Sequence, residues 1–204
     1  MNADAENGDE IATIRIELVG SSPVIWREVE VPVSVTLADL HEIVQGAMGW
    51  LDGHLWEFTV AGRRYGLPMD EDWGTEPRAV AASVALRDVL RPRRTTLTYL
   101  YDFGDDWEHR LTVTDVRPGR PRVSYPRHVG GEWNGPPEDC GGIPGFYGML
   151  DILGDPEHPD HAEIKEWLAG YDPEVVDEAR IKAALSRIAR RLKRARVRRP
   201  KPGG

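Results

Sequence analysis

The chain has 204 residues, of which 40% are hydrophobic and 29% are charged. These proportions are typical of globular proteins and exclude both a disordered and a membrane-embedded chain. Apolar runs fall short of the roughly 18 residues that a membrane helix needs, and the acidic N-terminus does not resemble a signal peptide. We therefore expect a cytoplasmic protein without membrane contacts.

The formal net charge of −8 is unevenly distributed. Residues 187–204 contain nine of the 26 Lys and Arg residues and none of the 34 Asp and Glu residues, so the rest of the chain carries −17. We predict an acidic, disordered N-terminus over residues 1–10, a single domain over 11–186 and a basic tail over 187–204.

The basic tail has two interpretations. It is either an arm that binds nucleic acid or an acidic protein, or a solvated helix end whose arginines complement the helix dipole. An acidic body repels phosphates, so any nucleic-acid contact belongs to this tail. The residues that would make the contact are Arg190, Arg191, Lys193, Arg194, Arg196, Arg198 and Arg199.

The first part of the chain alternates in hydrophobicity. Residues 11–18 and 24–31 predict a β-hairpin because apolar side chains recur at every second position. Thr36, followed three residues later by Asp39, is typical of a capping box that opens a helix, and Gly49 ends it. We expect this helix to cover the sheet.

Two further strands are predicted over residues 55–60 and 63–65, joined by a tight turn. Residues 67–80 carry the acidic and turn-forming residues of a surface loop. Ser83 is then in position to cap a short helix that ends near Leu90.

The clearest hairpin lies in the middle of the chain. Residues 95–101 and 107–116 are rich in β-branched and aromatic residues, with a turn at Gly104 and Asp105. Residues 125–145 are dominated by glycine, proline and polar residues, which indicates a long functional or packed loop rather than a regular element.

The C-terminal part is predicted to be helical. Short helices are expected over residues 146–153 and 161–168, and Asp172 with Pro173 is expected to begin a longer one. The apolar stripe of that helix is Val176, Ile181, Leu185, Ile188 and Leu192. The expected fold class is α+β, with a mostly antiparallel or mixed sheet covered by helices.

The segment YDFGDDWEH concentrates groups that bind divalent cations within one predicted hairpin. It contains Asp102, Asp105, Asp106, Glu108 and His109, interleaved with Tyr101, Phe103 and Trp107. On a strand Trp107 and His109 point one way and Glu108 the other, so only some of these groups can converge. Alternatively the aspartates form the turn, the aromatic rings pack, and His109 is an ordinary strand residue.

A second polar cluster, GEWNGPPEDCGG, contains Glu132, Glu138, Asp139 and Cys140 on a loop shaped by glycine and proline. Glu138 and Asp139 are candidates for metal ligands or a general base. Equally, Asp139 is in position to accept backbone N–H bonds that hold the loop together.

Cys140 is the only cysteine, which excludes an internal disulfide and a zinc site made of thiolates alone. It is a nucleophile only if a histidine lies close to it, and otherwise a small buried apolar residue. His54 lies at a predicted loop-to-strand junction, from which it can join either cluster. None of the well-known catalytic sequence signatures is present.

Several motifs occur together and in order: PVIWREVEVP, LADLHEIVQGAMGW, HLWEF, YDFGDDWEH, YPR followed by GGE, and PPEDCGG with GFYGML. Over residues 11–181 the chain resembles the plasmid pRiA4b ORF-3-like family. This resemblance implies an α+β fold and a passenger of plasmids or insertion elements, sometimes labelled resolvase-like, without an established activity. The chain has no serine-recombinase pattern to support strand cleavage.

The resemblance also exposes two departures. The family often has a second histidine where Trp56 stands and a cysteine where Gly135 stands. If either was a metal ligand, this protein has lost it, whereas YDFGDDWEH is untouched.

Three functions follow as hypotheses. The first is a non-catalytic binding or interaction module associated with mobile elements, in which the hairpin and the PPEDCGG loop form one rigid face. The second is a hydrolase in which Asp102, Asp106, His109, Glu138 and Asp139 hold a divalent metal that activates water. The third is an accessory protein that binds DNA through its tail.

Overall fold

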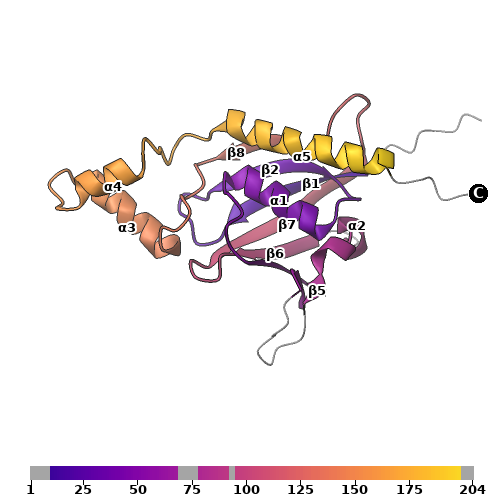
Figure 1. Cartoon of the computed structure of the whole chain (residues 1–204), viewed down its shortest axis with the longest axis horizontal. Helices are drawn as coiled ribbons and strands as arrows, with labels where there is room; N and C mark the ends of the chain where they lie inside the picture. Colours follow the sequence, from indigo (N-terminus) through magenta and orange to yellow (C-terminus); the bar gives the residue numbers. More distant parts are fainter. Residues whose placement is uncertain (1–9, 69–77, 92–94, 199–204) are drawn as a thin grey trace, which may run out of the picture.

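The computed structural model describes residues 10–68, 78–91 and 95–198, and the side chains of these residues up to Arg196 (Figure 1). The predicted disorder of the N-terminus, most of the predicted loop over 67–80, and the side chains of Arg198 and Arg199 lie outside the described residues.

One sheet of eight strands forms the centre of the domain, in the order β5-β4-β3-β6-β7-β1-β2-β8. All neighbours are antiparallel except β4 and β5, which are parallel. The strands are β1 (Glu10–Leu18), β2 (Trp26–Pro32), β3 (Trp56–Val60), β4 (Arg63–Gly66), β5 (Ala79–Val80), β6 (Thr95–Tyr101), β7 (Trp107–Pro118) and β8 (Arg127–Glu132).

The two predicted hairpins are confirmed. β1 pairs with β2 and β6 pairs with β7, and both hairpins bury every second side chain on one face. The buried positions of β6 and β7 pair across the strands, Tyr99 with His109 and Tyr101 with Trp107. The opposite face carries polar, partly exposed side chains, as expected of an antiparallel sheet with one solvated face.

Helices cover the apolar face of the sheet. The helices are α1 (Leu37–Met48), α2 (Leu86–Val89), α3 (Gly142–Gly154), α4 (His161–Trp167) and α5 (Glu178–Arg198), with a 3-10 turn at Ala81–Ser83. α1 and α5 lie side by side across the sheet, whereas α3 and α4 extend beyond its edge (Figure 1). The predicted α+β class, including the helical C-terminal portion, is confirmed.

α1 begins and ends as the sequence predicts. The Thr36 hydroxyl accepts a 3.0 Å hydrogen bond from the Asp39 amide, and the Asp39 carboxylate accepts one from the Thr36 amide. Gly49 ends the helix in the left-handed conformation at φ 85°, where glycine has no steric penalty.

Gly46 brings α1 and α5 close together. A Cβ at Gly46 would lie 3.3 Å from the Ala184 Cβ, and Leu185 and Ile188 of α5 also lie beside this glycine. The exposed Arg191 adds ion pairs to Asp39, at 2.9 Å, and to Glu42 of α1. The predicted basic tail therefore begins within a helix that packs on the domain, with no structural break at residue 186.

Three element predictions need correction. Residues 127–132 form strand β8 within the predicted loop, since they pair with β2 although glycine occupies two of the six positions. The short helix α2 begins after Ala85, because the Ser83 hydroxyl donates to the Val80 carbonyl instead of capping it. α5 begins at Glu178, because Asp172 accepts from the Glu174 amide in a local turn and Asp177 accepts from the Arg180 amide.

Within the described part of the chain, none of the helices combines the length and the apolar composition needed to cross a bilayer.

Candidate functional site: a groove beside an acidic cluster

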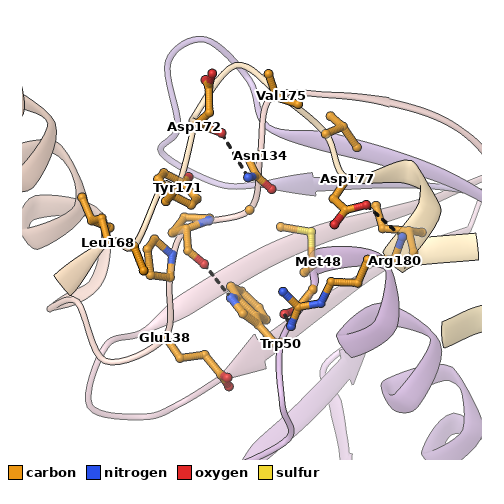
Figure 2. Close-up of a pocket in the computed structure, with 18 of the residues that line it drawn as sticks. Met48, Trp50, Asn134, Glu138, Leu168, Tyr171, Asp172, Val175, Asp177 and Arg180 are labelled. Atoms are coloured by element: carbon orange, nitrogen blue, oxygen red, sulfur yellow. Dashed lines mark hydrogen bonds between the residues drawn. The ribbon is translucent and has the colours of Figure 1, made fainter. Parts of the chain in front are cut away.

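A groove of about 880 Å³ opens between the C-terminal end of α1, the loop 134–138 and the segment that joins α4 to α5 (Figure 2). Its lining combines apolar and aromatic side chains with charged ones. They include Met48, Trp50, Asn134, Glu138, Tyr171 and Arg180.

A closed ring of hydrogen bonds fixes the loop that follows α1. The Gln45 amide donates to the Tyr99 hydroxyl at 2.9 Å, and the Gln45 oxygen accepts from the Asp52 amide at 3.0 Å. His41 completes the ring, with Nδ1 2.7 Å from the Tyr99 oxygen and Nε2 2.7 Å from the Asp52 carboxylate. Burial lowers the pKa of His41 despite the nearby Asp52, so the imidazole of His41 is neutral at pH 7.

The tautomer of this buried histidine follows from its partners. A carboxylate only accepts hydrogen bonds, so His41 Nε2 carries the proton and Nδ1 accepts the hydrogen of Tyr99. The imidazole also stacks on Trp56, with ring centroids 4.0 Å apart and planes at 10°. Trp56, where the resemblance implies a histidine in relatives, therefore supports the ring of hydrogen bonds here.

Glu138 joins the two loops that flank the groove. Its carboxylate accepts a 2.5 Å hydrogen bond from the Tyr101 hydroxyl and a 2.9 Å bond from the Leu51 amide. The Trp50 indole donates to the Pro136 carbonyl at 2.9 Å, as Figure 2 shows. Burial, then Glu138, raise the pKa of Tyr101, which stays protonated as the donor.

Gly135 fits closely in this wall of the groove. A Cβ on Gly135 would collide with the Met48 carbonyl oxygen. A cysteine here, as the resemblance implies for relatives, would require a different local backbone.

The guanidinium groups of two arginines at the groove have only carbonyl partners among the described residues. Arg27 is fully buried and donates to the carbonyls of Ala47, Trp26, Glu132 and Trp133. Arg180 donates to the Gly49 carbonyl at 3.0 Å. Burial lowers the pKa of Arg27 to about 10, so its guanidinium remains charged at neutral pH.

The acidic side chains of the groove already have partners of their own. Asp172 and Asp177 accept backbone amides in the turn before α5, Glu138 binds Tyr101, and Glu178 pairs with Lys182. In the described part of the chain, the guanidinium groups of Arg27 and Arg180 therefore form no ion pair with these carboxylates.

A cluster of three side chains lies next to the groove, where Asp139 follows Glu138. His54 Nδ1 is 3.5 Å from the Asp102 carboxylate and His54 Nε2 is 3.0 Å from the Asp139 carboxylate. One ligand atom from each residue lies within 4.8 Å of the others, so the three form a possible metal-binding group, called here the acidic cluster.

Hydrogen bonds and close backbone packing hold the segments around the acidic cluster in place. Asp102 has φ 55° and accepts the Gly104 and Asp105 amides at 2.9 and 3.3 Å. Asp105 accepts the Gly141 amide at 3.1 Å, and a Cβ on Gly142 would collide with the Asp105 carbonyl. The hairpin turn and the PPEDCGG loop are thus in direct contact.

The structure brings together Asp102, Asp139 and His54 but not the other predicted ligands. His109 is fully buried beside the rings of Trp50 and Tyr99, and its Nδ1 donates to the Trp107 carbonyl at 3.1 Å. It cannot join Asp102, because position 109 faces the core together with the buried Trp107, while Glu108 faces solvent. Asp106 is exposed in the turn at φ 60°.

Two other candidate residues, Glu132 and Cys140, lie in environments that indicate a structural role. Glu132 accepts a 3.1 Å hydrogen bond from the Trp26 indole at the edge of the sheet. Burial raises the pKa of Cys140 to about 12, and Asp105 adds to this shift, so its thiol is protonated at neutral pH.

The tail residues divide into two groups. Arg191 pairs with α1, and Arg196 donates to the Ser34 hydroxyl. Arg190, Lys193 and Arg194 are exposed on α5.

Apart from Glu138, the residues that shape the groove were not predicted from the sequence. Arg27 offered one signal, because it shares a strand face with Val29 and Val31 and a charge at an inward position indicates burial. Tyr101 and Arg180 carried no signal, since their partners lie far away in the sequence.

Similarity to known proteins covers most of the chain, including the groove and the acidic cluster. Residues 10–180 match the family model described as plasmid pRiA4b ORF-3-like protein. The uncharacterized protein y4hQ of Sinorhizobium fredii is 34% identical over 181 residues, which are 88% of this chain and 92% of that protein. A crystal structure of MM3350, a protein of unknown function from Methanosarcina mazei, is similar with a TM-score of 0.78 and 31% identity, covering 84% of this chain and 97% of that one.

Proposed function

The chain belongs to the plasmid pRiA4b ORF-3-like family, and we propose that it is a non-catalytic binding module whose groove takes a small amphipathic ligand carrying a carboxylate. The observation that carries this proposal is that Arg180, exposed at the groove, has only a carbonyl acceptor for its guanidinium, and that the buried guanidinium of Arg27 adds a second positive charge behind the groove. A bound anion supplies the countercharge, and a charge-assisted hydrogen bond is about twice as strong as a neutral one.

The rest of the lining supports an apolar portion in the same ligand. Met48, Leu168 and Val175 contribute aliphatic surface, and Trp50 and Tyr171 contribute aromatic surface. Pockets of this kind are mostly apolar, with a few polar groups that fix the orientation of the ligand. Because Glu138 and the ring of hydrogen bonds around Asp52 hold the adjacent loops, the groove is formed before ligand binds.

The test compares hexanoate with hexanol, which share an apolar chain and differ in charge. We expect calorimetric titration to show hexanoate binding about tenfold tighter or more, and Arg180→Gln to abolish that difference. Arg194→Gln, an exposed arginine of the same helix outside the groove, is the matched control. Equal binding of acid and alcohol to the wild-type protein would refute the proposal.

A substitution at an apolar position of the lining tests the same groove independently. Val176→Asp places a carboxylate among the lining residues and is expected to weaken hexanoate binding about tenfold. Val24→Asp, at an exposed valine of the β1–β2 turn, is the control and should bind like the wild type.

We propose a divalent-cation site at the acidic cluster as a second candidate function. It is favoured by the convergence of His54, Asp102 and Asp139, which replaces the set expected from the sequence. An imidazole and two carboxylates suit Mn²⁺ or Zn²⁺, and Asp139, with a side chain 71% exposed, is free to adjust to an ion. A bound cation of this type polarises a substrate or activates water, which is the chemistry that a metal-dependent hydrolase requires.

Metal content tests this second proposal without requiring activity. Protein dialysed against Mn²⁺ or Zn²⁺ should retain one ion per chain, and the His54→Ala, Asp139→Ala double variant should retain none. Asp106→Ala, Glu108→Ala is the matched control, because both acidic residues lie nearby and outside the cluster. Equal metal content in the wild type and the first double variant contradicts the site.

A further inference from the structure

A second cavity, of about 470 Å³, lies between β8 and α5. Four of the ten residues that line it are Lys or Arg, one is His and none is acidic. This composition is unexpected in a chain with 34 acidic and 26 basic residues. The charged or polar lining residues that matter are Arg127, His128, Lys182, Ser186, Arg190 and Lys193.

The cavity-lining residues of α5 are spaced so that they lie on one side of the helix. Lys182, Ser186 and Arg190 follow one another at intervals of four residues, and Lys193 lies three residues beyond. Side chains at these intervals are neighbours on a helix surface. The buried Leu185 also lines the cavity, so cations surround an apolar floor.

His128 lines this cavity from β8, where it pairs with Val29 of β2. The residue is only 7% exposed, yet neither ring nitrogen has a hydrogen-bond partner among the described residues. A buried polar group without a partner costs free energy, so this imidazole favours a ligand that bonds to it. Burial lowers the pKa of His128, as do Arg27 and Lys182, while Glu178 raises it.

The basic residues around His128 differ in their existing partners. Arg127 donates to Glu30 at 2.5 Å, and Lys182 pairs with Glu178 at 2.5 Å. Arg190 and Lys193 form no ion pair within the described ranges, and both are exposed at the cavity. Two positive charges are therefore available to a dianion.

We propose that this cavity binds a phosphate dianion, free or as the monoester of a small molecule. Arg190 and Lys193 neutralise the phosphate, and His128 donates one N–H to a phosphate oxygen. A phosphate monoester has three terminal oxygens and free phosphate has four, which is enough to accept from both cationic side chains and from the imidazole. The phosphodiester of a nucleic acid strand, by contrast, carries a nucleoside on both sides and suits an open basic surface.

Calorimetric titration with inorganic phosphate and with glycerol phosphate, at low ionic strength, tests the proposal. We expect at least one of the two to bind, and Arg190→Ala, Lys193→Ala to weaken it by about tenfold or more. The matched control is Arg187→Ala, Arg194→Ala, which removes the same charge from α5 outside the cavity and should change the affinity by less than about twofold. Tighter binding of one probe identifies the free anion or the ester as the preferred form.

His128→Leu is expected to weaken the same binding while leaving the fold intact, which circular dichroism checks. Arg180→Gln, in the groove, should leave phosphate binding unchanged, so failure of one site is distinguishable from failure of the other. The proposal is overturned if neither probe binds, or if the two double variants lose affinity equally. It is also overturned if a single-stranded oligonucleotide binds through Arg190 and Lys193 while both small phosphates do not.

Discussion

The phenolic hydroxyl of Tyr101 donates a 2.5 Å hydrogen bond to the carboxylate of Glu138, 37 residues further along the chain. The same phenolic oxygen accepts the Gly53 amide at 2.9 Å, and the same carboxylate accepts the Leu51 amide. Two side chains thus connect the end of β6, the loop after α1 and the loop before α3. This connection gives the groove a fixed wall.

Replacing Glu138 should therefore destabilise the whole domain. Glu138→Ala leaves the Tyr101 hydroxyl and the Leu51 amide without their acceptor, and we expect the free energy of unfolding to fall by about 1–3 kcal/mol. Urea denaturation of both proteins measures the change. Glu166→Ala, an exposed glutamate of α4, is the control and should lie within about 0.5 kcal/mol of the wild type. Equal losses for the two variants would contradict this function of Glu138.

Much of the fold could be predicted because it depends on local patterns. Alternation identified the β1–β2 and β6–β7 hairpins, and the Thr36–Asp39 capping box identified α1. β8 was missed because its sequence, RHVGGE, has weak strand propensity and is held by pairing with β2. The start of α5 was misplaced because Asp172 and Asp177 have the same capping chemistry, and it is Asp177 that accepts an amide of α5, from Arg180.

The candidate site was predicted only in part, for a related reason. The two polar segments do meet, through Asp105 and Gly141, which the sequence could not establish. The set of ligands that converge depends on which side of the sheet each side chain lies. His109 lies on the core side, whereas His54 approaches Asp102 from another loop. The pairing of Arg27 with carbonyl oxygens has no sequence signature, because its acceptors are backbone atoms of three separate segments.

The crossing of α1 and α5 should be sensitive to side-chain volume at Gly46. Gly46→Leu inserts a side chain where even a Cβ lies 3.3 Å from the Ala184 Cβ, and we expect a loss of about 1–3 kcal/mol in urea denaturation. Gly148→Leu is the matched control, because no atom lies within 4 Å of a Cβ on that helical glycine. The control should be neutral or stabilising by up to about 1 kcal/mol, since leucine favours helix. A similar response of the two variants would contradict close packing of α5 on α1.

His109 should make the stability of the protein depend on pH. Burial lowers its pKa from 6.5 to about 4, so the unfolded chain binds more protons between these values. The free energy of unfolding is therefore undiminished above pH 6.5 and falls as the pH is lowered towards 4, by up to about 3 kcal/mol from this residue. Burial of His41 and His128 acts in the same direction.

The variant His109→Phe isolates this contribution. Its free energy of unfolding, measured in urea at several pH values between 7 and 4, should fall less steeply than that of the wild type. The difference between the two proteins should change by up to about 3 kcal/mol in favour of the variant. His161→Gln, at a partly exposed histidine of α4, should follow the wild-type curve. Parallel curves for His109→Phe and the wild type would mean that the buried imidazole is protonated as readily in the folded chain as in the unfolded one.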